Sequence, residues 1–189
     1  MVKQTNNDQV LRFSPYAWAK AIYYLQNADT EVSMMGISAE NDYLFIENVF
    51  LVEQKCTKAH TEFDDEAYNN YIYDMCALKG MEMQRVGRIW IHTHPSFGAA
   101  PSGTDNATLR DIFGGCDWAV RVILGKISDK KEVDYDCTLQ IKNPAMHIPL
   151  EVTVDWDCDF PKSDAKQWKE ELDEQVTHVI IPAVVHTNG

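Results

Sequence analysis

Two histidines and an aspartate in residues 86–113 have the types and the spacing of a metal site. His92 and His94 come at the end of an apolar run that predicts a strand over residues 86–92. Because side chains alternate along a strand, the two imidazoles point the same way and can reach one ion. Asp105 falls in the first turn of a helix predicted over 104–113 and can face the end of that strand. Two imidazoles and one carboxylate leave a fourth tetrahedral position open for water, which is typical of a catalytic zinc site.

The loop between the second histidine and the aspartate completes a longer motif. The segment resembles the JAMM motif of the JAB/MPN zinc metallopeptidases, which reads His-x-His-Pro, six residues, and then Ser-x-x-Asp. The matching residues are His92, His94, Pro95, Ser102 and Asp105. The family also carries a glutamate upstream, at the start of a strand that contains a glycine, and Glu31 precedes Gly36 in such a segment. The resemblance extends over residues 31 to about 141 and leaves both ends of the chain unmatched.

The resemblance implies a role for each of these side chains. His92, His94 and Asp105 would hold zinc, which lowers the pKa of its bound water and makes that water the nucleophile. Glu31 would be the general base that takes the proton from the water and passes it to the leaving amine. Ser102 would donate its hydroxyl to the developing oxyanion.

Each residue also has an ordinary structural explanation. The histidines suit a strand end, Ser102 suits a helix N-cap, and Asp105 suits a first helical turn because the helix dipole favours an acid there. A glutamate at a strand start, such as Glu31, is common. The spacing of the whole set nevertheless favours the metal site over these separate explanations.

The family implies hydrolysis of the peptide or isopeptide bond after the C-terminal small residue of a ubiquitin-like protein. Such an enzyme removes the modifier from its targets, processes its precursor, or does both. The chain resembles compact prokaryotic or viral members of the family, and Gln54, after the second predicted strand, is similar to the prokaryotic pattern. Prokaryotic members accompany modifier-activating and modifier-conjugating enzymes, sometimes in antiviral defence. The folded modifier would be recognised by a hydrophobic surface, although core packing is the expected fate of most candidates. The candidates are Tyr43, Phe45, Phe50, Tyr68, Tyr71 and Tyr73.

Three other functions remain open. The first is a RadC-like protein, but that pattern has asparagine between the histidines, where this chain has Thr93. The second is a peptidase of phage tails or cell walls, which usually carries a second hydrolase domain. The third is a non-catalytic MPN scaffold, a class that characteristically loses the metal ligands, all of which are present here.

The hydrophobic pattern predicts the elements that position this site. Helices are expected over 13–26, 61–79, 104–113 and 163–175. Ser14 is the expected N-cap of the first and Ser163 that of the last. The second is expected to begin with Thr61 and Asp64 and to end at Gly80. Strands are expected over 31–38, 43–52, 86–92, 118–124, 133–141, 151–156 and 176–185, with turns at 39–42 and 129–131. Strands and helices that alternate loosely, with several hairpins, predict an α/β (α+β) fold with a mixed, curved sheet flanked by helices. The resemblance implies the MPN form of that fold, which has cytidine-deaminase-like layers.

Length and composition predict one domain over residues 1–150, with 151–189 as an extension packed on it. Five cysteines without a Cys-x-x-Cys pair suggest reduced thiols in the cytoplasm, and no signal peptide or long apolar run is visible. A formal net charge of -12 argues against nucleic acid as a partner. The acidic series at 155, 157 and 159 lacks the glycine and the terminal glutamate of a calcium loop and is expected to be solvated or at a strand edge. The remaining histidines are expected at the surface or in packing; they are His60, His147, His178 and His186.

Overall fold

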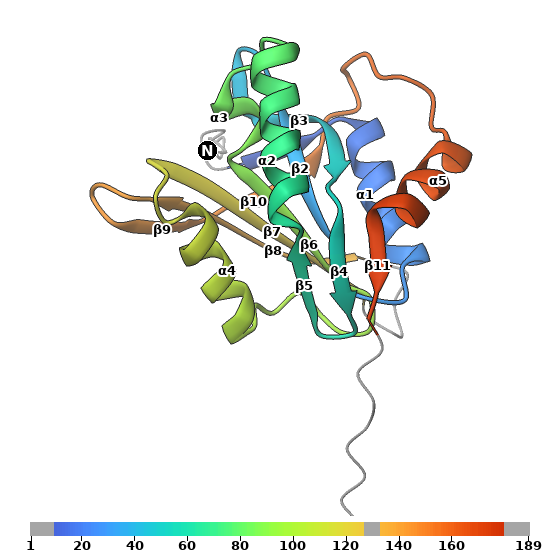
Figure 1. Cartoon of the computed structure of the whole chain (residues 1–189). Helices are drawn as coiled ribbons and strands as arrows, with labels where there is room; N and C mark the ends of the chain where they lie inside the picture. Colours follow the sequence, from blue (N-terminus) through green and yellow to red (C-terminus); the bar gives the residue numbers. More distant parts are fainter. Residues whose placement is uncertain (1–9, 127–132, 180–189) are drawn as a thin grey trace, which may run out of the picture.

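The computed structural model describes residues 10–126 and 133–179, and its largest unit is a mixed eight-stranded sheet (Figure 1). Across the sheet the strands are β10 (Glu151–Val154), β1 (Val10–Phe13), β3 (Asp42–Leu51), β2 (Ser33–Ala39), β6 (Ile89–His94), β7 (Trp118–Lys126), β8 (Val133–Ile141) and β9 (Met146–Pro149). β1 runs parallel to both of its neighbours and β6 runs parallel to β7, whereas the other pairs are antiparallel.

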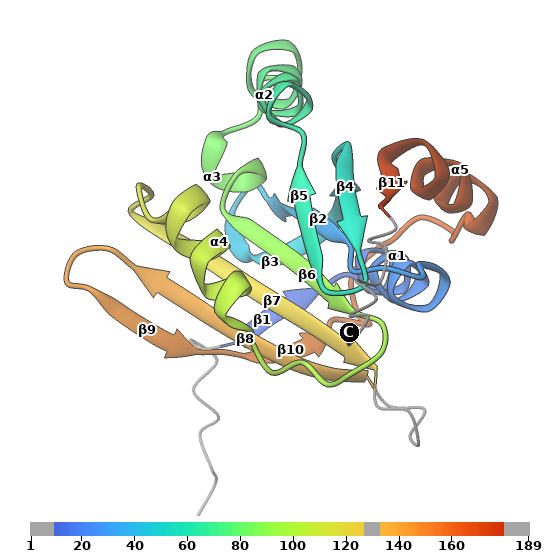
Figure 2. The ribbon, with the colours of Figure 1, turned by 60° about the horizontal axis from the view of Figure 1, so that its bottom comes forward.

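The sheet curls until β10 approaches β8 (Figure 2). The amide of Leu150 donates to the carbonyl of Cys137 over 2.9 Å, and the Tyr135 hydroxyl donates to Glu151 over 2.9 Å. These contacts make the curved sheet nearly closed. The expected α+β class, with a mixed curved sheet and flanking helices, is therefore confirmed.

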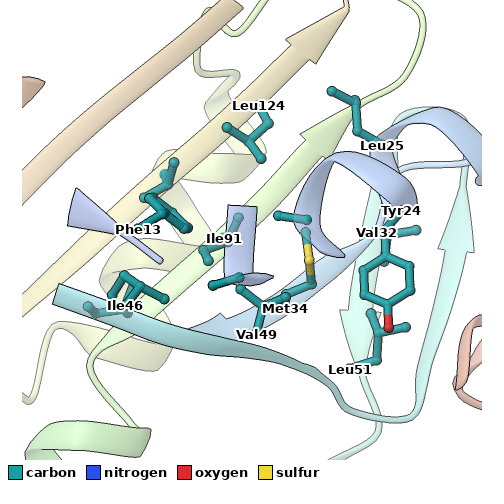
Figure 3. Packing of buried hydrophobic residues seen from close by; sticks show 14 of the residues in the cluster. Phe13, Tyr24, Leu25, Val32, Met34, Ile46, Val49, Leu51, Ile91 and Leu124 are labelled. Atoms are coloured by element: carbon teal, nitrogen blue, oxygen red, sulfur yellow. The ribbon is translucent and has the colours of Figure 1, made fainter. Parts of the chain in front are cut away.

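Helices cover both faces of the sheet. α1 (Pro15–Asn27) and α5 (Ala165–Gln175) lie on one side, and α2 (Asp65–Tyr73), α3 (Met83–Val86) and α4 (Gly103–Phe113) lie on the other (Figures 1 and 2). β6 is buried from both sides because its side chains alternate. Ile89 and Ile91 belong to the apolar cluster under α1, part of which Figure 3 shows, whereas Trp90 belongs to the cluster under α4. The face that carries Trp90 is also the face of His92 and His94.

Helix starts were predicted with mixed success. Ser14 is the N-cap of α1, as expected, and its Oγ accepts a hydrogen bond from the amide of Ala17 over 3.1 Å. The predicted cap Ser163 is wrong, because Asp164 caps α5 by accepting from the amide of Gln167 over 3.0 Å. An aspartate serves as well as a serine at an N-cap, so the pattern alone could not choose between neighbours.

The largest correction concerns the helix predicted to open at Thr61. Residues 54–63 instead form a hairpin of β4 (Gln54–Thr57) and β5 (His60–Phe63), and β4 also pairs with β11 (Val176–His178). The Thr61 hydroxyl donates to the side chain of Gln54 over 2.8 Å, so it is not a helix cap. Asp64 caps α2 instead, and α2 continues into a π-helical turn, η2 (Asp74–Leu78), before Gly80 adopts a positive φ of 69°.

The C-terminal segment packs on the rest of the molecule. β10 pairs with β1 in the sheet, and Trp168 and Leu172 of α5 enter the apolar cluster under α1. The ammonium of Lys20 on α1 lies 2.7 Å from the carboxylate of Glu171, and both side chains are largely buried. The predicted strand over 151–156 ends at Val154, and Asp155 of the acidic series pairs with Arg12 over 2.7 Å.

Some features were not predicted or lie outside the described residues. β1, β9 and α3 are short and had no clear pattern. The five cysteines each carry a free thiol. Among the residues that the structure covers, no helix has both the length and the apolar character needed to cross a membrane. The turn predicted at 129–131, the strand residues 180–185 and His186 lie outside the described residues.

Candidate metal centre

The two histidines end the central strand of the sheet. β6 lies between β2 and β7, with His92 opposite Ser33 on one side and Ile123 on the other. His92 and His94 are buried, each with about 1% of its surface exposed. Strand alternation places both imidazoles on the face covered by α4. The two rings meet edge to face, with their centroids 5.0 Å apart.

The N-terminal cap of α4 aims Asp105 at the histidines. The Ser102 hydroxyl accepts from the amide of Asp105 over 3.1 Å, and the Asp105 carboxylate accepts from the amide of Ser102 over 2.6 Å. This reciprocal capping box fixes the carboxylate. Its Oδ1 lies 3.4 Å from Nε2 of His92, and its Oδ2 lies 3.6 Å from Nε2 of His94. Ser102 is exposed and is the N-cap, and because its oxygen accepts in this contact, its own proton is left to donate elsewhere.

Glu31 reaches the same two imidazoles from the segment just before β2. Its amide donates to the carbonyl of Thr57 over 3.0 Å, and its side chain is buried. Oε2 lies 3.2 Å from Nε2 of His92, and Oε1 lies 3.9 Å from Nε2 of His94. Glu31, His92 and His94 therefore form a buried group that can hold a metal ion, with one ligand atom from each within 4.8 Å of the others.

The donor set fits a tetrahedral ion. Ligand atoms about 2.0–2.1 Å from a tetrahedral zinc lie roughly 3.3 Å from one another. The carboxylate oxygens of Asp105 lie 3.4 and 3.6 Å from Nε2 of His92 and Nε2 of His94, and those of Glu31 lie 3.2 and 3.9 Å from the same two atoms. Nε2 of His92 is fully buried, yet within the described residues nothing makes a hydrogen bond to it. This nitrogen is therefore available to an ion.

The outer ring nitrogens are held by other groups. Nδ1 of His94 lies 3.0 Å from the carbonyl oxygen of Gly98 and must donate to it, because a carbonyl only accepts. Nδ1 of His92 lies 3.4 Å from Oγ of Ser33, which also accepts from the indole nitrogen of Trp90 over 2.9 Å. Such outer contacts fix the ring and leave Nε2 for the metal.

Neighbouring groups in the site shift the pKa values of His94 and Asp105 in opposite directions. Burial lowers the pKa of His94, but its hydrogen bonds to Asp105 and to the Gly98 carbonyl, with the charge of Glu31, raise that pKa above its ordinary value. Burial raises the pKa of Asp105, but its hydrogen bonds with His94 and Ser102 lower that pKa well below its usual range. The carboxylate is therefore ionised at neutral pH, as a metal ligand must be.

The loop that supplies the Gly98 carbonyl is fastened to β7 and β8. The amide of Ala99 donates to Asp134 over 2.9 Å, and the amide of Lys126 donates to the carbonyl of Phe97 over 3.0 Å. A Cβ at Gly125 would lie 2.4 Å from the backbone nitrogen of Ala99, so only glycine allows this approach. These contacts were not foreseen, because backbone groups leave no mark in the sequence.

Arg121 was also not predicted from the sequence to support the site. It is buried in β7, and its guanidinium donates to Asn106 over 2.8 Å and to Asp136 over 2.9 Å. Because Asn106 follows Asp105, this contact ties the start of α4 to the sheet. An arginine within the apolar strand Ala119–Leu124 was a visible signal, since a buried charge needs partners.

A groove of about 450 Å³ borders the site between β5 and α4. Ser33, the partner of His92, and Thr104, the neighbour of Asp105, are among its lining residues. It also carries carboxylates, aromatic rings and an aliphatic side chain: Glu62, Asp65, Asp111, Phe63, Tyr68 and Ile112. His60 also lines this groove, whereas His147 is exposed on β9 and Nδ1 of His178 lies 3.1 Å from the Thr30 hydroxyl.

The six aromatic residues named above as candidates for modifier binding do not form one surface. Tyr71 is buried and stacks on Phe50, with ring centroids 5.3 Å apart. Tyr43 stacks on Trp118 at the start of β7, the opposite end from the histidines. Phe45 lies under the guanidinium of Arg12, and Tyr73 is exposed at the end of α2. Tyr68 alone among the six lines the groove.

No protein-family model matches this chain, and no curated protein matches it significantly. Among solved structures, the chain is similar to the solution structure of the protein DSY2949 from Desulfitobacterium hafniense. The TM-score is 0.49 and the sequence identity 14%, over 79% of this chain and 95% of that one. Support for a metal centre therefore comes from the chain's own residues.

Proposed function

We propose that this protein is a zinc-dependent peptidase that cleaves the peptide or isopeptide bond after the C-terminal small residue of a ubiquitin-like modifier. The observation that carries the proposal is the buried convergence of His92, His94 and Asp105 with Glu31, around an imidazole nitrogen to which no described residue makes a hydrogen bond. These side chains are also the ones that match the JAMM motif. A structural role for the histidines would instead leave a buried polar atom unsatisfied at a cost of about 1–3 kcal/mol.

In this proposal the residues divide the chemistry. His92, His94 and Asp105 would hold the ion; zinc, when bound, acidifies water and polarises the carbonyl that is attacked. Glu31 takes the proton from the attacking water and returns it to the leaving amine. Ser102 donates its free hydroxyl proton to the carbonyl oxygen as negative charge develops there.

The groove between β5 and α4 supports an extended peptide as the substrate. It leads to Ser33 and Thr104, beside the proposed ligands, so a chain lying in it would present a peptide bond to the site. Small residues next to the scissile bond would let the backbone approach the buried centre. The carboxylates of Glu62, Asp65 and Asp111 favour basic residues farther along the substrate. The folded modifier would then bind outside the groove and supply remote binding energy.

The test is cleavage of purified ubiquitin-like fusions by zinc-loaded protein, followed by intact mass. The expected product ends at the small C-terminal residue of the modifier, and a bulky β-branched residue at that position should stop cleavage. A free tail peptide should be a poor substrate because it lacks the remote contacts. Equal turnover of tail peptide and fusion would favour a general peptidase, and zinc binding without cleavage of any fusion would favour a scaffold.

A further inference from the structure

Gln54 is a wholly buried amide whose hydrogen bonds converge on the segment that carries Glu31. Its Oε1 accepts from the amide of Ser33 over 2.8 Å and from the Thr61 hydroxyl over 2.8 Å. Its Nε2 donates to the carbonyl of Ser33 over 2.7 Å and to that of Val52 over 2.9 Å. The orientation of the amide is fixed, because the backbone N–H of Ser33 only donates and its carbonyl only accepts.

This side chain replaces a missing strand partner. β2 pairs with β3 only from Met34 onward, where Met34 faces Leu51. Beyond Leu51 the chain turns away toward β4, which leaves Ser33 without a backbone partner on that side among the residues that the structure describes. The Gln54 amide pairs with both the N–H and the C=O of Ser33, as a neighbouring strand would.

Two groups of the proposed site depend on the segment that Gln54 holds. Oγ of Ser33 lies 3.4 Å from Nδ1 of His92, so movement of Ser33 would release the outer side of a ligand imidazole. Glu31 lies two residues earlier, and in an extended chain residues two apart share a face. A shift of Ser33 would therefore displace the proposed base together with the partner of His92.

We propose that Gln54 is a positioning residue, which holds Glu31 and Ser33 in register with His92. The inference rests on the proposed function for its catalytic part, whereas its metal-binding part stands on geometry alone. Only an amide of this length supplies an acceptor and two donors at once: glutamate lacks the donors, methionine lacks both, and asparagine is shorter. A misplacement of about 1 Å at a catalytic centre can cost about 10²-fold in rate.

The experiment compares Gln54→Met with Ser38→Ala. Ser38 is also buried in β2 and donates a side-chain hydrogen bond to the carbonyl of Tyr43 over 2.9 Å, but at the other end of the strand. Three quantities are measured on both variants: the zinc dissociation constant by competition with a chromophoric chelator, the visible spectrum of the cobalt-loaded protein, and kcat and KM on a modifier fusion.

We expect Gln54→Met to raise the zinc dissociation constant about 10- to 100-fold, as when a group that orients a ligand histidine is lost. It should also shift the cobalt bands and lower kcat at least tenfold, with a smaller change in KM. Ser38→Ala should lower the melting temperature without changing the other quantities. If Gln54→Met lowered only the melting temperature, the proposal would be overturned.

A second variant, Gln54→Glu, and the wild-type protein complete the experiment. If Gln54→Met does not fold, Gln54→Glu is used instead, because it keeps the shape and the acceptor oxygen while removing both N–H donors. The zinc dissociation constant, the cobalt bands and kcat are expected to change in the same directions. Should the wild-type protein bind zinc but cleave no fusion, the proposed function fails. The zinc constant and the cobalt spectrum still decide whether Gln54 positions the metal-binding residues.

Discussion

Glu31 and Asp105 approach the same nitrogen from different elements: Oε2 of Glu31 lies 3.2 Å and Oδ1 of Asp105 lies 3.4 Å from Nε2 of His92. The Asp105 carboxylate is held by the capping box of α4, through a 2.6 Å hydrogen bond from the amide of Ser102. A carboxylate fixed in this way suits a metal ligand, whereas a base must exchange a proton during turnover. In the proposed function Asp105 is the ligand and Glu31 the base, and the capping box that fixes Asp105, rather than its distance from His92, supports this assignment.

The first prediction tests this assignment. Glu31→Gln should keep about one zinc per chain and lose hydrolysis by two or more orders of magnitude, the scale for removing a general base. Asp105→Asn should lose most of the zinc, because a neutral amide is a poor ligand. Elemental analysis and turnover of a modifier fusion measure both effects. Loss of zinc from Glu31→Gln, with zinc retained in Asp105→Asn, would reverse the two roles.

Zinc affinity should fall as the solution becomes acidic, and the fall should begin above the ordinary pKa of histidine. The pKa of His94 is raised in the metal-free protein by its hydrogen bonds to Asp105 and Gly98, so its proton is retained to higher pH. A protonated imidazole cannot bind the ion, and each unit of pH below that pKa should weaken binding up to about tenfold. Asp105, whose pKa is lowered, adds no pH dependence in this range. Chelator competition between pH 8 and pH 5.5 measures the curve, and a flat curve would contradict it.

Gly125→Ala should weaken metal binding although the residue touches no ligand. Its Cβ would meet the backbone nitrogen of Ala99 at 2.4 Å and the carbonyl carbon of Gly98 at 2.5 Å, so the loop must move away from β7. The Gly98 carbonyl would then release His94, which should raise the zinc dissociation constant about tenfold. Gly115→Ala is the control, because nothing lies within 4 Å of its Cβ position. Equal zinc affinity in the two variants would show that the loop does not orient His94.

Charge reversal in the groove should act on substrate binding rather than on the metal. The variant Glu62→Lys would raise KM several-fold for substrates with basic residues near the scissile bond, with zinc content unchanged. The effect should shrink at high salt, because this side chain is solvent-screened. Glu40→Lys, on the exposed turn between β2 and β3, adds positive charge away from the groove and is the control. An equal rise in KM for this control would mean that only net charge matters.

Lys20→Met should destabilise the whole domain by about 3 kcal/mol, because it leaves the carboxylate of Glu171 largely buried without its cation. Urea unfolding measures the loss. Glu171 also accepts from the amide of Leu51 over 3.1 Å, so adding Glu171→Leu should restore only part of the stability. A separate, early transition for the C-terminal segment, with the rest of the protein unaffected, would show that α5 is not part of the same cooperative unit.

Hydrophobic periodicity predicted much of the fold, whereas short polar patterns led to a wrong element at residues 54–63. The strand over 133–141 matches β8 residue for residue, and the Ser14 cap is confirmed. The β4–β5 hairpin was missed because its inner side chains include Gln54 and Thr61, which bond to each other and give no apolar alternation. The acids after Thr61 are typical of a helix start, but that start lies three residues later, at Asp64.

The site divides in the same way. His92, His94 and Asp105 could be named from type and spacing, whereas Glu31 and Ser102 were implied by the resemblance. The groups that orient these side chains could not be named, since the Gly98 carbonyl is backbone and Ser33 is one of two serines in β2. Arg121 was readable in principle, because a charge within an apolar strand needs buried partners.

The parallel pairing of β6 with β7 has a consequence for the evolution of this site. Two parallel neighbours need a crossover connection, and here the crossover is the loop after His94 followed by α4. The crossover therefore places the first turn of α4 across the end of β6. Insertions after Gly114 would lengthen the connection from α4 to β7 without moving the candidate metal centre. Insertions between His94 and Ser102 would instead move α4, and Asp105 with it, away from the histidines. From this topology we expect homologous chains to keep the span between the second histidine and the aspartate and to vary in length beyond α4.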